Sequence, residues 1–356
     1  MTGLVLVINL GSSSLKAALV DCTGANVWSF HRKRTSNESI SSVLDQWVTP
    51  ELDCYRKHIQ LIGHRVVHGG DHFTAPTLIT PDLEHALQML IPLAPLHNKP
   101  ALDGLAWAQR WGPDCPQWAC FDTAFHRTLP EAARTYAIPK NLRDQGLHRY
   151  GFHGINHQHV SEYVANHWRK KGGEASQLRL ISAHLGAGAS LAAVKGGYCI
   201  DTTMGFTPLE GLVMETRSGS IDPGLILELI RQGFCETELS RLLQYESGLK
   251  GLSGLSGDMC EIRESALAAH PGAVLALAVF RHRLLQQLGA MAASLQGVDV
   301  LALTGGIGEH DEALRIELHE SLKWWGEFET VVVPADEEGM IARLCLRHQF
   351  LLTATD

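Results

Sequence analysis

The sequence predicts an α/β protein of two lobes, each built on a mixed sheet flanked by helices. The chain has 356 residues, about two domains' worth at roughly 150 residues per domain. Hydrophobic residues make up 45% and charged residues 19%, a globular mixture that excludes a disordered or low-complexity chain. Two glycine-rich patterns lie half a chain apart, a period too long for a solenoid. Duplication of a whole lobe is therefore favoured, with chance resemblance as the alternative.

The first pattern, residues 4–21, predicts a strand, a tight turn and a second strand. Apolar β-forming residues flank the small-residue break at residues 11–14. Residues 178–194 repeat the pattern, with Leu-Gly at 185–186 matching Leu-Gly at 10–11. Walker-type loops and dinucleotide fingerprints place their glycines at the start of a helix, so two hairpins disfavour both of these nucleotide folds.

Helices are predicted in the second half of the chain. Residues 225–231 follow Asp222-Pro223, an N-cap and a first-turn proline, and end at Gly233. A longer helix is expected over residues 272–295, ended by Gly297. The positions expected on its buried side are Leu275, Val279, Leu284 and Leu288.

The C-terminal part continues the α/β pattern and sets the lobe boundaries. A glycine-rich turn at residues 305–309 follows a strand-like run and precedes a helical pattern over residues 312–325. The last segment, residues 338–348, is expected to be helical and to pack on the first lobe. The boundary is placed near Asp122. The expected lobes are residues 1–122 with 338–356, and residues 123–337.

Charge and cysteine content exclude several classes of protein. The 30 Lys and Arg against 38 Asp and Glu give a formal charge of -8, which argues against a nucleic-acid groove. The apolar runs fall short of the ~20 residues of a membrane span, and no basic segment follows Met1, so a cytoplasmic protein is expected. The eight cysteines form no C-x-x-C pair and are expected to be reduced thiols.

The first hairpin is a candidate phosphate-binding site. Its backbone N–H groups can approach an anion, Ser12 and Ser14 add hydroxyl donors, and Lys16 adds a cation. The alternative is an ordinary turn with a snorkelling lysine. Repetition of the pattern near Gly186, and the glycine-rich turn at residues 305–308, favour the phosphate interpretation.

Several side chains stand in settings typical of a catalytic site. Arg65 precedes a double glycine and Arg217 lies in a long aperiodic loop, where each would bind a carboxylate or phosphoryl group or form a surface ion pair. Asp122 follows an apolar strand, where it would either serve a site or cap a helix. His153, between two glycines, is expected to be exposed. Glu337 opens the last helix, where it would hold Mg²⁺ or interact with the helix dipole.

Short motifs of characteristic residues occur together along nearly the whole chain. They occupy residues 9–16, 64–70, 94–98, 121–126, 149–154, 184–190, 201–212, 216–219, 305–309 and 337–343. In this combination the sequence resembles the acetate kinase family of short-chain acyl kinases, within the actin, sugar kinase and Hsp70 superfamily. The resemblance implies duplicated ribonuclease H-like (actin-like ATPase) lobes with mixed five-stranded sheets and a central cleft.

The resemblance also implies a reaction. The expected activity is reversible, Mg²⁺- or Mn²⁺-dependent transfer of the ATP γ-phosphoryl group to acetate, giving acetyl phosphate and ADP, in a homodimer. Such a transfer needs in-line positioning and charge neutralisation and no covalent enzyme intermediate. A carboxylate that attacks without a proton to lose needs no general base, so Asp122 is assigned an orienting role.

The site residues follow motif by motif. The resemblance assigns catalysis to Arg65, Asp122, His153 and Arg217, and the metal to Asn9 and Glu337. The substrate-binding positions are Arg65, Val67, Leu96, His97 (displayed on a turn), Phe152 and Pro208. The nucleotide positions are Ser12, Ser14, Lys16, His184, Leu185, Gly186, Ala187, Gly188, Asp258, Met259, Cys260, Gly306, Ile307, Gly308, Glu309 and His310.

Three nucleotide positions depart from the family pattern. Ala187 and His310 each replace an Asn, and Cys260 replaces an Arg. Each lost hydrogen bond weakens nucleotide binding by about 1 to 2 kcal/mol. Glu215 and Ser220 also replace a Gly and an Asp around Arg217.

Alternatives to acetate kinase therefore stay open. They are a propionate or other short-chain acyl kinase, a pyrophosphate-dependent variant, and a non-catalytic acyl-phosphate or nucleotide sensor. The first stays open because one methylene in an apolar pocket changes discrimination between substrates by only about 1 to 3 kcal/mol. The intact arginines at 65 and 217 argue against the sensor.

Overall fold

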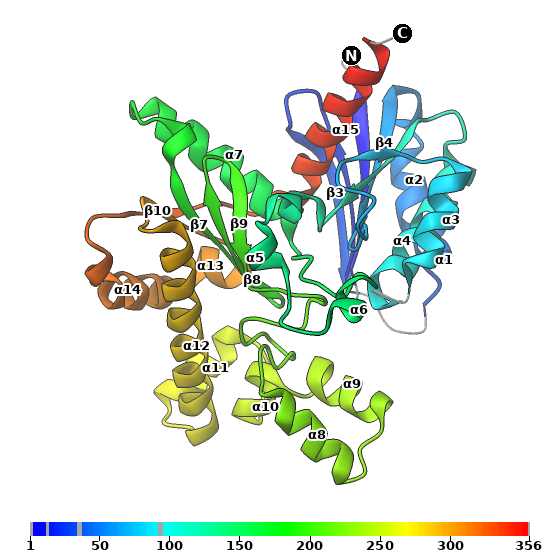
Figure 1. The fold of residues 1–356 in the computed structure, drawn as a ribbon. Coiled ribbons are helices and arrows are strands. Elements are labelled where there is room, and N and C mark those ends of the chain that lie inside the picture. The colour runs from blue at the N-terminus through cyan, green and yellow to red at the C-terminus, as the bar shows by residue number, and fades with distance from the viewer. Residues whose placement is uncertain (1–2, 12–13, 34–37, 92–94, 355–356) are drawn as a thin grey trace. The chain divides into compact units, whose positions relative to one another are not determined.

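The computed structural model describes residues 3–11, 14–33, 38–91 and 95–354 (Figure 1). The chain divides into two compact units. Unit 1 comprises Met1–Arg127, His153–His159 and Asp336–Asp356, and unit 2 comprises Thr128–Phe152 and Val160–Ala335. Among the described residues, no helix combines the length and apolar composition that crossing a membrane requires.

Unit 1 is built on a six-stranded sheet of order β3-β2-β1-β4-β6-β5. β1 pairs antiparallel with β2, and β2 with β3, whereas β1, β4 and β6 run parallel to one another. The sixth strand, which the five-strand prediction lacks, is a two-residue edge strand. The strands are β1 (Leu4–Leu10), β2 (Ser14–Val20), β3 (Asn26–Lys33), β4 (Ile59–Val66), β5 (Thr77–Leu78) and β6 (Gln117–Phe121).

Alternation along the buried strand β1 gives unit 1 a core on each face of its sheet. Leu6 and Ile8 belong to one core, which contains Trp107 of α4 (Pro95–Trp111). Val5 and Val7 belong to the other core, with α15 (Glu337–Thr353), which packs on this lobe as predicted (Figure 1). The remaining helices are α1 (Ile40–Val43), η1 (Leu44–Val48), α2 (Thr49–Leu52), η2 (Arg56–His58), α3 (Pro81–Met89) and η4 (Ala124–Thr128); α7 (Gly154–Lys170) begins in this unit.

Unit 2 repeats the same sheet. Its order, β9-β8-β7-β10-β11, matches β3-β2-β1-β4-β6 strand for strand, with the same antiparallel and parallel pairs. This match confirms the predicted fold class and the two hairpins. The strands are β7 (Arg179–Leu185), β8 (Ala189–Lys195), β9 (Tyr198–Thr202), β10 (Val300–Thr304) and β11 (Glu329–Val332).

The helices of unit 2 agree with the prediction in part. Asp222 caps α8 as predicted, with its side chain accepting from the N–H of Gly224. In α12 Leu284 and Leu288 are buried and Val279 is half-buried, but Leu275 is 52% exposed, and Ala273 and Ala276 are the buried residues in that part of the helix. The predicted turn at 305–309 is a helix, α13. The elements are α5 (Glu131–Arg134), α6 (Lys140–Arg143), η5 (Ala175–Gln177), α8 (Pro223–Arg231), α9 (Glu236–Tyr245), α10 (Gly248–Ser253), α11 (Met259–Leu267), α12 (Pro271–Leu295), α13 (Gly305–His310), α14 (Glu312–Ser321) and η6 (Lys323–Trp325).

Candidate active site

The parallel strands of unit 1 bring polar side chains to one sheet edge. Asn9 lies near the end of β1, Arg65 near the end of β4, and Asp122 directly after β6. Because the carboxyl ends of neighbouring parallel strands meet, these side chains gather, as α/β sites commonly do. The start of α15 adds Glu337 and Glu338. We call these five residues the Arg65 cluster.

Arg65 is the hub of this cluster. Its Nε and Nη2 donate to Asp122 Oδ2 at 3.1 and 2.6 Å, and its Nη1 donates to Asn9 Oδ1 at 3.1 Å. The Asn9 amide in turn donates to Glu337 Oε2 at 3.0 Å and to Glu338 Oε1 at 2.6 Å. Arg65 therefore binds the Asp122 carboxylate directly, and Asn9 links it to the two carboxylates on α15.

Burial and charge act in opposite directions within the cluster. Burial favours the neutral forms, and it raises the pKa of Asp122, which is 1% exposed, although Arg65 partly offsets this. For Arg65, burial acts to lower the pKa, but Asp122, Glu337 and Glu338 outweigh it and raise the pKa above its ordinary value. Arg65 is thus a permanent, oriented cation beside an acidic group.

The start of α7 fixes Asp122 from the other side. The Gly154 N–H donates to the Asp122 carbonyl at 2.9 Å, and the Ile155 N–H donates to the Asp122 carboxylate. A Cβ on Gly154 would overlap that carbonyl, so only glycine fits there. His153 immediately precedes it with φ +56° and is half-buried rather than exposed as predicted. A histidine in this backbone conformation is typical of a functional position.

Glu338 is the functional candidate that sequence reasoning missed. It receives the Asn9 amide, and its carboxylate lies 3.9 Å from Lys16 Nζ on β2. The available signal was the tandem Glu337-Glu338 pair at the start of the last helix. Ser14 is half-buried at the start of β2, and Ser12 lies outside the described residues.

The oxygen donors of the cluster fit a magnesium ion. The described residues contain no group of three or more His, Cys, Asp or Glu side chains placed to hold a metal. Mg²⁺, however, is usually held by one or two carboxylates together with substrate phosphates and water. Two carboxylates that converge on one amide, those of Glu337 and Glu338 on Asn9, supply this set.

The predicted acyl-pocket residues fall in both units. In unit 1 Val67 is buried, and in unit 2 Phe152 is buried and Pro208 half-buried. His97 and Leu96 lie in the first turn of α4, so His97 is helical rather than on a turn, and their side chains are outside the described set.

Arg217 lies in the irregular segment of unit 2 between β9 and α8, as predicted. Its Nη1 donates to the Pro208 carbonyl at 2.9 Å. The backbone around it is fixed, because the Met214 N–H donates to the Arg217 carbonyl at 3.2 Å and the Ser247 N–H donates to the Thr216 carbonyl at 3.0 Å. The guanidinium is therefore held by the loop that carries it.

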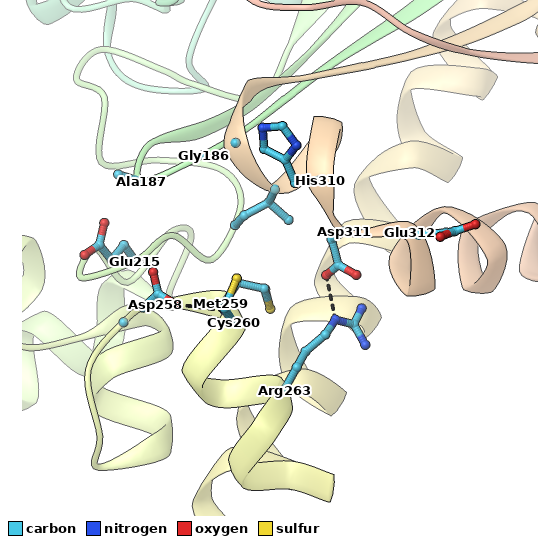
Figure 2. A pocket seen from close by; sticks show the side chains of 13 residues that line it. Gly186, Ala187, Glu215, Asp258, Met259, Cys260, Arg263, His310, Asp311 and Glu312 are labelled. Atoms are coloured by element: carbon cyan, nitrogen blue, oxygen red, sulfur yellow. Dashed lines mark hydrogen bonds and ion pairs between the residues drawn. The ribbon is translucent and has the colours of Figure 1, made fainter. Parts of the chain in front are cut away.

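Unit 2 also contains a cavity of about 400 Å³ (Figure 2). It gathers eight of the predicted nucleotide residues, including all three that depart from the family pattern. Those eight are Gly186, Ala187, Asp258, Met259, Cys260, Gly306, Ile307 and His310. Sequence reasoning did not assign the other five lining residues to the nucleotide, Glu215, Gly257, Arg263, Asp311 and Glu312.

Other predicted nucleotide residues do not line this cavity. His184 and Leu185 lie in β7, Gly188 in the turn between β7 and β8, and Gly308 in α13. The Glu309 carboxylate instead accepts the N–H groups of Gly305 and Ala335, each at 3.0 Å, which gives it a structural contact at the start of α13.

Among the charged groups that line the cavity, Arg263 and Asp311 form an ion pair. Arg263 Nε donates to Asp311 Oδ2 at 2.6 Å and its Nη1 to Glu317 at 3.3 Å. Asp258 caps α11 through the N–H groups of Cys260 and Glu261, at 2.9 and 3.1 Å. Apolar side chains such as Met259 and Ile307 face the same space, so the cavity can hold a flat, partly apolar group such as a base.

Behind the Arg65 cluster, His64 predicts a pH dependence of stability. Burial lowers the pKa of His64 to about 4, although its Nε2 hydrogen bond to Gln117 Oε1 at 2.9 Å acts to raise it. A lowered folded-state pKa gives stability that is present above pH 6.5 and lost as the pH falls towards 4. We expect the free energy of unfolding to fall by about 3 kcal/mol more in the wild type than in His64→Gln between pH 7 and pH 4.

Urea unfolding at several pH values measures this difference. The matched control is His282→Gln, at an exposed position on α12, which should follow the wild-type curve. Equal losses in the wild type and His64→Gln would show that His64 does not contribute.

Comparison with known proteins places these features in a family. The sequence profile of the Acetokinase family matches residues 28–339. An acetate kinase from Synechococcus sp. is 52% identical over 254 residues, which are 71% of this chain and 62% of that relative's length. Acetate kinase from Porphyromonas gingivalis superimposes with a TM-score of 0.86 at 33% identity, covering 96% of this chain and 98% of the other. A propionate kinase from Francisella tularensis gives 0.88 at 34%, covering 96% and 99%. The chain belongs to the acetokinase family, phosphotransferases with a carboxylate acceptor.

Proposed function

We propose that this protein is an acetate kinase, which reversibly transfers the γ-phosphoryl group of ATP to acetate and gives acetyl phosphate and ADP. The observation that carries the proposal is the Arg65 cluster, a permanent guanidinium fixed by Asp122 and Asn9 at the carboxyl end of a sheet. Arg217 offers a second guanidinium fork in unit 2. Such forks bind carboxylates and neutralise a transferring phosphoryl group.

The other residues take supporting roles. The cavity of unit 2 receives the nucleotide, and His153 donates a hydrogen bond to the phosphoryl group. Glu337, Glu338 and Asn9 would hold Mg²⁺, which would neutralise phosphate charge. No protein group forms a covalent bond to the substrate, because the acetate oxygen itself attacks the phosphorus and ADP leaves.

Trapping acetyl phosphate with hydroxylamine tests the activity. Purified wild type with acetate and Mg-ATP should form hydroxamate, and Arg217→Ala, confirmed as folded by circular dichroism, should keep only a small residual activity. Absence of product from folded wild type would overturn the proposal. If product formed only with pyrophosphate, the phosphoryl donor would be pyrophosphate and not ATP. The same assay with propionate measures the acyl preference, for which the likeness to a propionate kinase gives a second candidate.

We further propose that the protein is a cytoplasmic homodimer. Helix α8 has no buried residue and exposes Leu225, Leu227 and Ile230, and Leu227 and Ile230 share one side of the helix, as at an interaction site. Light scattering should give twice the chain mass for the wild type, and Leu227→Glu should lower it to one chain.

The eight cysteines are all free, including Cys120 and Cys345 with sulfurs 3.7 Å apart, which supports a reducing compartment.

A further inference from the structure

Arg217 depends on a loop that has little regular structure of its own. The guanidinium donates to the Pro208 carbonyl and contacts the Met214 sulfur, so the direction of that carbonyl contributes to the direction of the guanidinium. Pro208 lies in the irregular stretch that follows β9, where no strand or helix fixes the backbone. Something else must hold Pro208 in place.

The backbone just before Pro208 is held from one neighbouring segment. Arg149 Nη1 donates to three consecutive carbonyls, those of residues 202, 203 and 204, at 3.2, 3.2 and 2.9 Å. The next carbonyl, of Gly205, accepts the N–H groups of residues 150 and 151. The N–H of Phe206 then donates to the Tyr136 hydroxyl at 2.9 Å.

Glu210 closes the stretch from the other side. Its Oε1 accepts Arg149 Nη2 at 2.8 Å and its Oε2 accepts the Tyr136 hydroxyl at 2.5 Å. The guanidinium also lies over the Tyr136 ring, 5.6 Å from its centroid. A Cβ on Gly205 would overlap both the Glu210 carboxylate and the Tyr136 hydroxyl. The ring of hydrogen bonds that joins Arg149, Glu210 and Tyr136 to this stretch therefore forms only because residue 205 is glycine. Pro208 is thus between two held ends, Phe206 and Glu210.

The members of this ring suit a fixed support. Arg149 has 16% of its side chain exposed, and its fork is saturated by four acceptors. Burial first, and the hydrogen bond to Glu210 second, raise the pKa of Tyr136 to about 12, so the hydroxyl stays a donor at physiological pH. The ring lines neither the cavity of unit 2 nor any other described cavity.

We propose that Arg149, Glu210 and Tyr136 form a clamp that orients the Pro208 carbonyl and, through it, the Arg217 guanidinium. They are positioning residues for the transfer, and the inference rests on the proposed function of Arg217. Loss of the clamp should misdirect Arg217 and lower kcat while leaving nucleotide affinity unchanged.

A double-mutant cycle tests the clamp. Tyr136→Phe and Glu210→Gln should each lower kcat about five- to tenfold, with the Kd for ADP within about twofold of wild type. In an Arg217→Ala background the same changes should alter residual activity less than about twofold, because Arg217 is already gone. Tyr198→Phe, an exposed tyrosine of unit 2, is the matched control. If the loss of kcat from a clamp substitution and the loss from Arg217→Ala were fully additive, the clamp would be overturned.

A readout without catalysis separates this inference from the proposed function. Hydrogen exchange of peptides spanning residues 203–217 should speed up in Tyr136→Phe and Glu210→Gln and stay at the wild-type rate in Tyr198→Phe. If folded wild type makes no acetyl phosphate but exchange still rises, the clamp stands and the proposed reaction fails. Unchanged exchange in both clamp variants would overturn the clamp whatever the activity.

Discussion

Arg65→Ala is expected to lower kcat for acetyl phosphate formation by at least about 10³, with a smaller change in the KM for ATP. The substitution removes the cation that Asp122, Glu337 and Glu338 surround and the fork that would meet the carboxylate or phosphoryl group. Loss of one fixed donor to a transition-state charge typically costs about 10² to 10³ in kcat, and Arg65 supplies a full charge besides. Hydroxamate formation by the purified variant measures the effect.

The same change should also destabilise the fold. Removing one partner of a buried ion pair leaves an uncompensated charge, at a cost of about 3 to 5 kcal/mol. The Arg65→Ala/Asp122→Asn double variant should recover part of that stability, because the stranded carboxylate is gone, while activity stays lost. Arg65→Lys keeps the charge but cannot reproduce three fixed donors, so it should restore stability more than kcat.

These outcomes separate chemistry from folding. A loss of kcat that is fully reversed by the stabilising second substitution would mean that Arg65 acts through the fold alone. Turnover of Arg65→Ala within tenfold of wild type would remove Arg65 from the proposed transfer.

Much of the Arg65 cluster could be predicted because strand register decides it. Asn9, Arg65 and Asp122 each stand at the carboxyl end of an apolar run, and parallel pairing of β1, β4 and β6 brings such ends together. The two hairpins could be predicted because apolar β-forming runs on both sides of a small-residue turn are a local pattern in the sequence.

What the sequence could not show depends on contacts between distant segments. The role of Glu338 requires knowing that the first turn of α15 lies against β1 and β2, some 330 residues earlier in the chain. Leu275 lies about 180° around α12 from Leu284, so it faces solvent, while Ala273 and Ala276 occupy the buried side. Gly305 and Gly306 are poor helix formers, yet α13 begins at them. Gly305 has φ +79°, and a Cβ there would overlap the Leu185 carbonyl, so the long-range approach of β7 requires glycine at the start of this helix.

The Arg149 clamp shows the same limit for polar residues. Arg149 lies in a motif that sequence reasoning used only for its neighbours at 152 and 153, and Tyr136 stood in no motif at all. Their partners lie 53 to 74 positions further along the chain. An arginine that donates to consecutive backbone carbonyls leaves no periodic or compositional trace.

Asp122→Asn is the second large expected effect, with kcat lowered about 10²-fold. The substitution is nearly isosteric, but donors surround this side chain: two N–H groups of Arg65 and the Ile155 N–H. An amide must point its NH₂ at one of these donors, and it no longer neutralises Arg65. Such an amide would misdirect Arg65, and loss of one fixed donor to a transition-state charge typically costs about 10² to 10³ in kcat.

The pH profile of the variant decides between two roles for Asp122. Acetate at neutral pH has no proton to give up, so a base contributes nothing, and an orienting Asp122 predicts the same fractional loss in kcat at every pH from 6 to 9. If Asp122 acted as a base, the wild-type kcat would fall at low pH as its carboxylate became protonated, and the variant would lack this fall. The fractional loss of kcat in the variant would then grow with pH as the wild-type carboxylate ionises. Asp122→Ala is the companion variant, because it removes the mispaired amide and admits water. If it is more active than Asp122→Asn, the cost lies in donor opposition at Arg65, whereas near-full turnover in Asp122→Asn would remove the orienting role altogether.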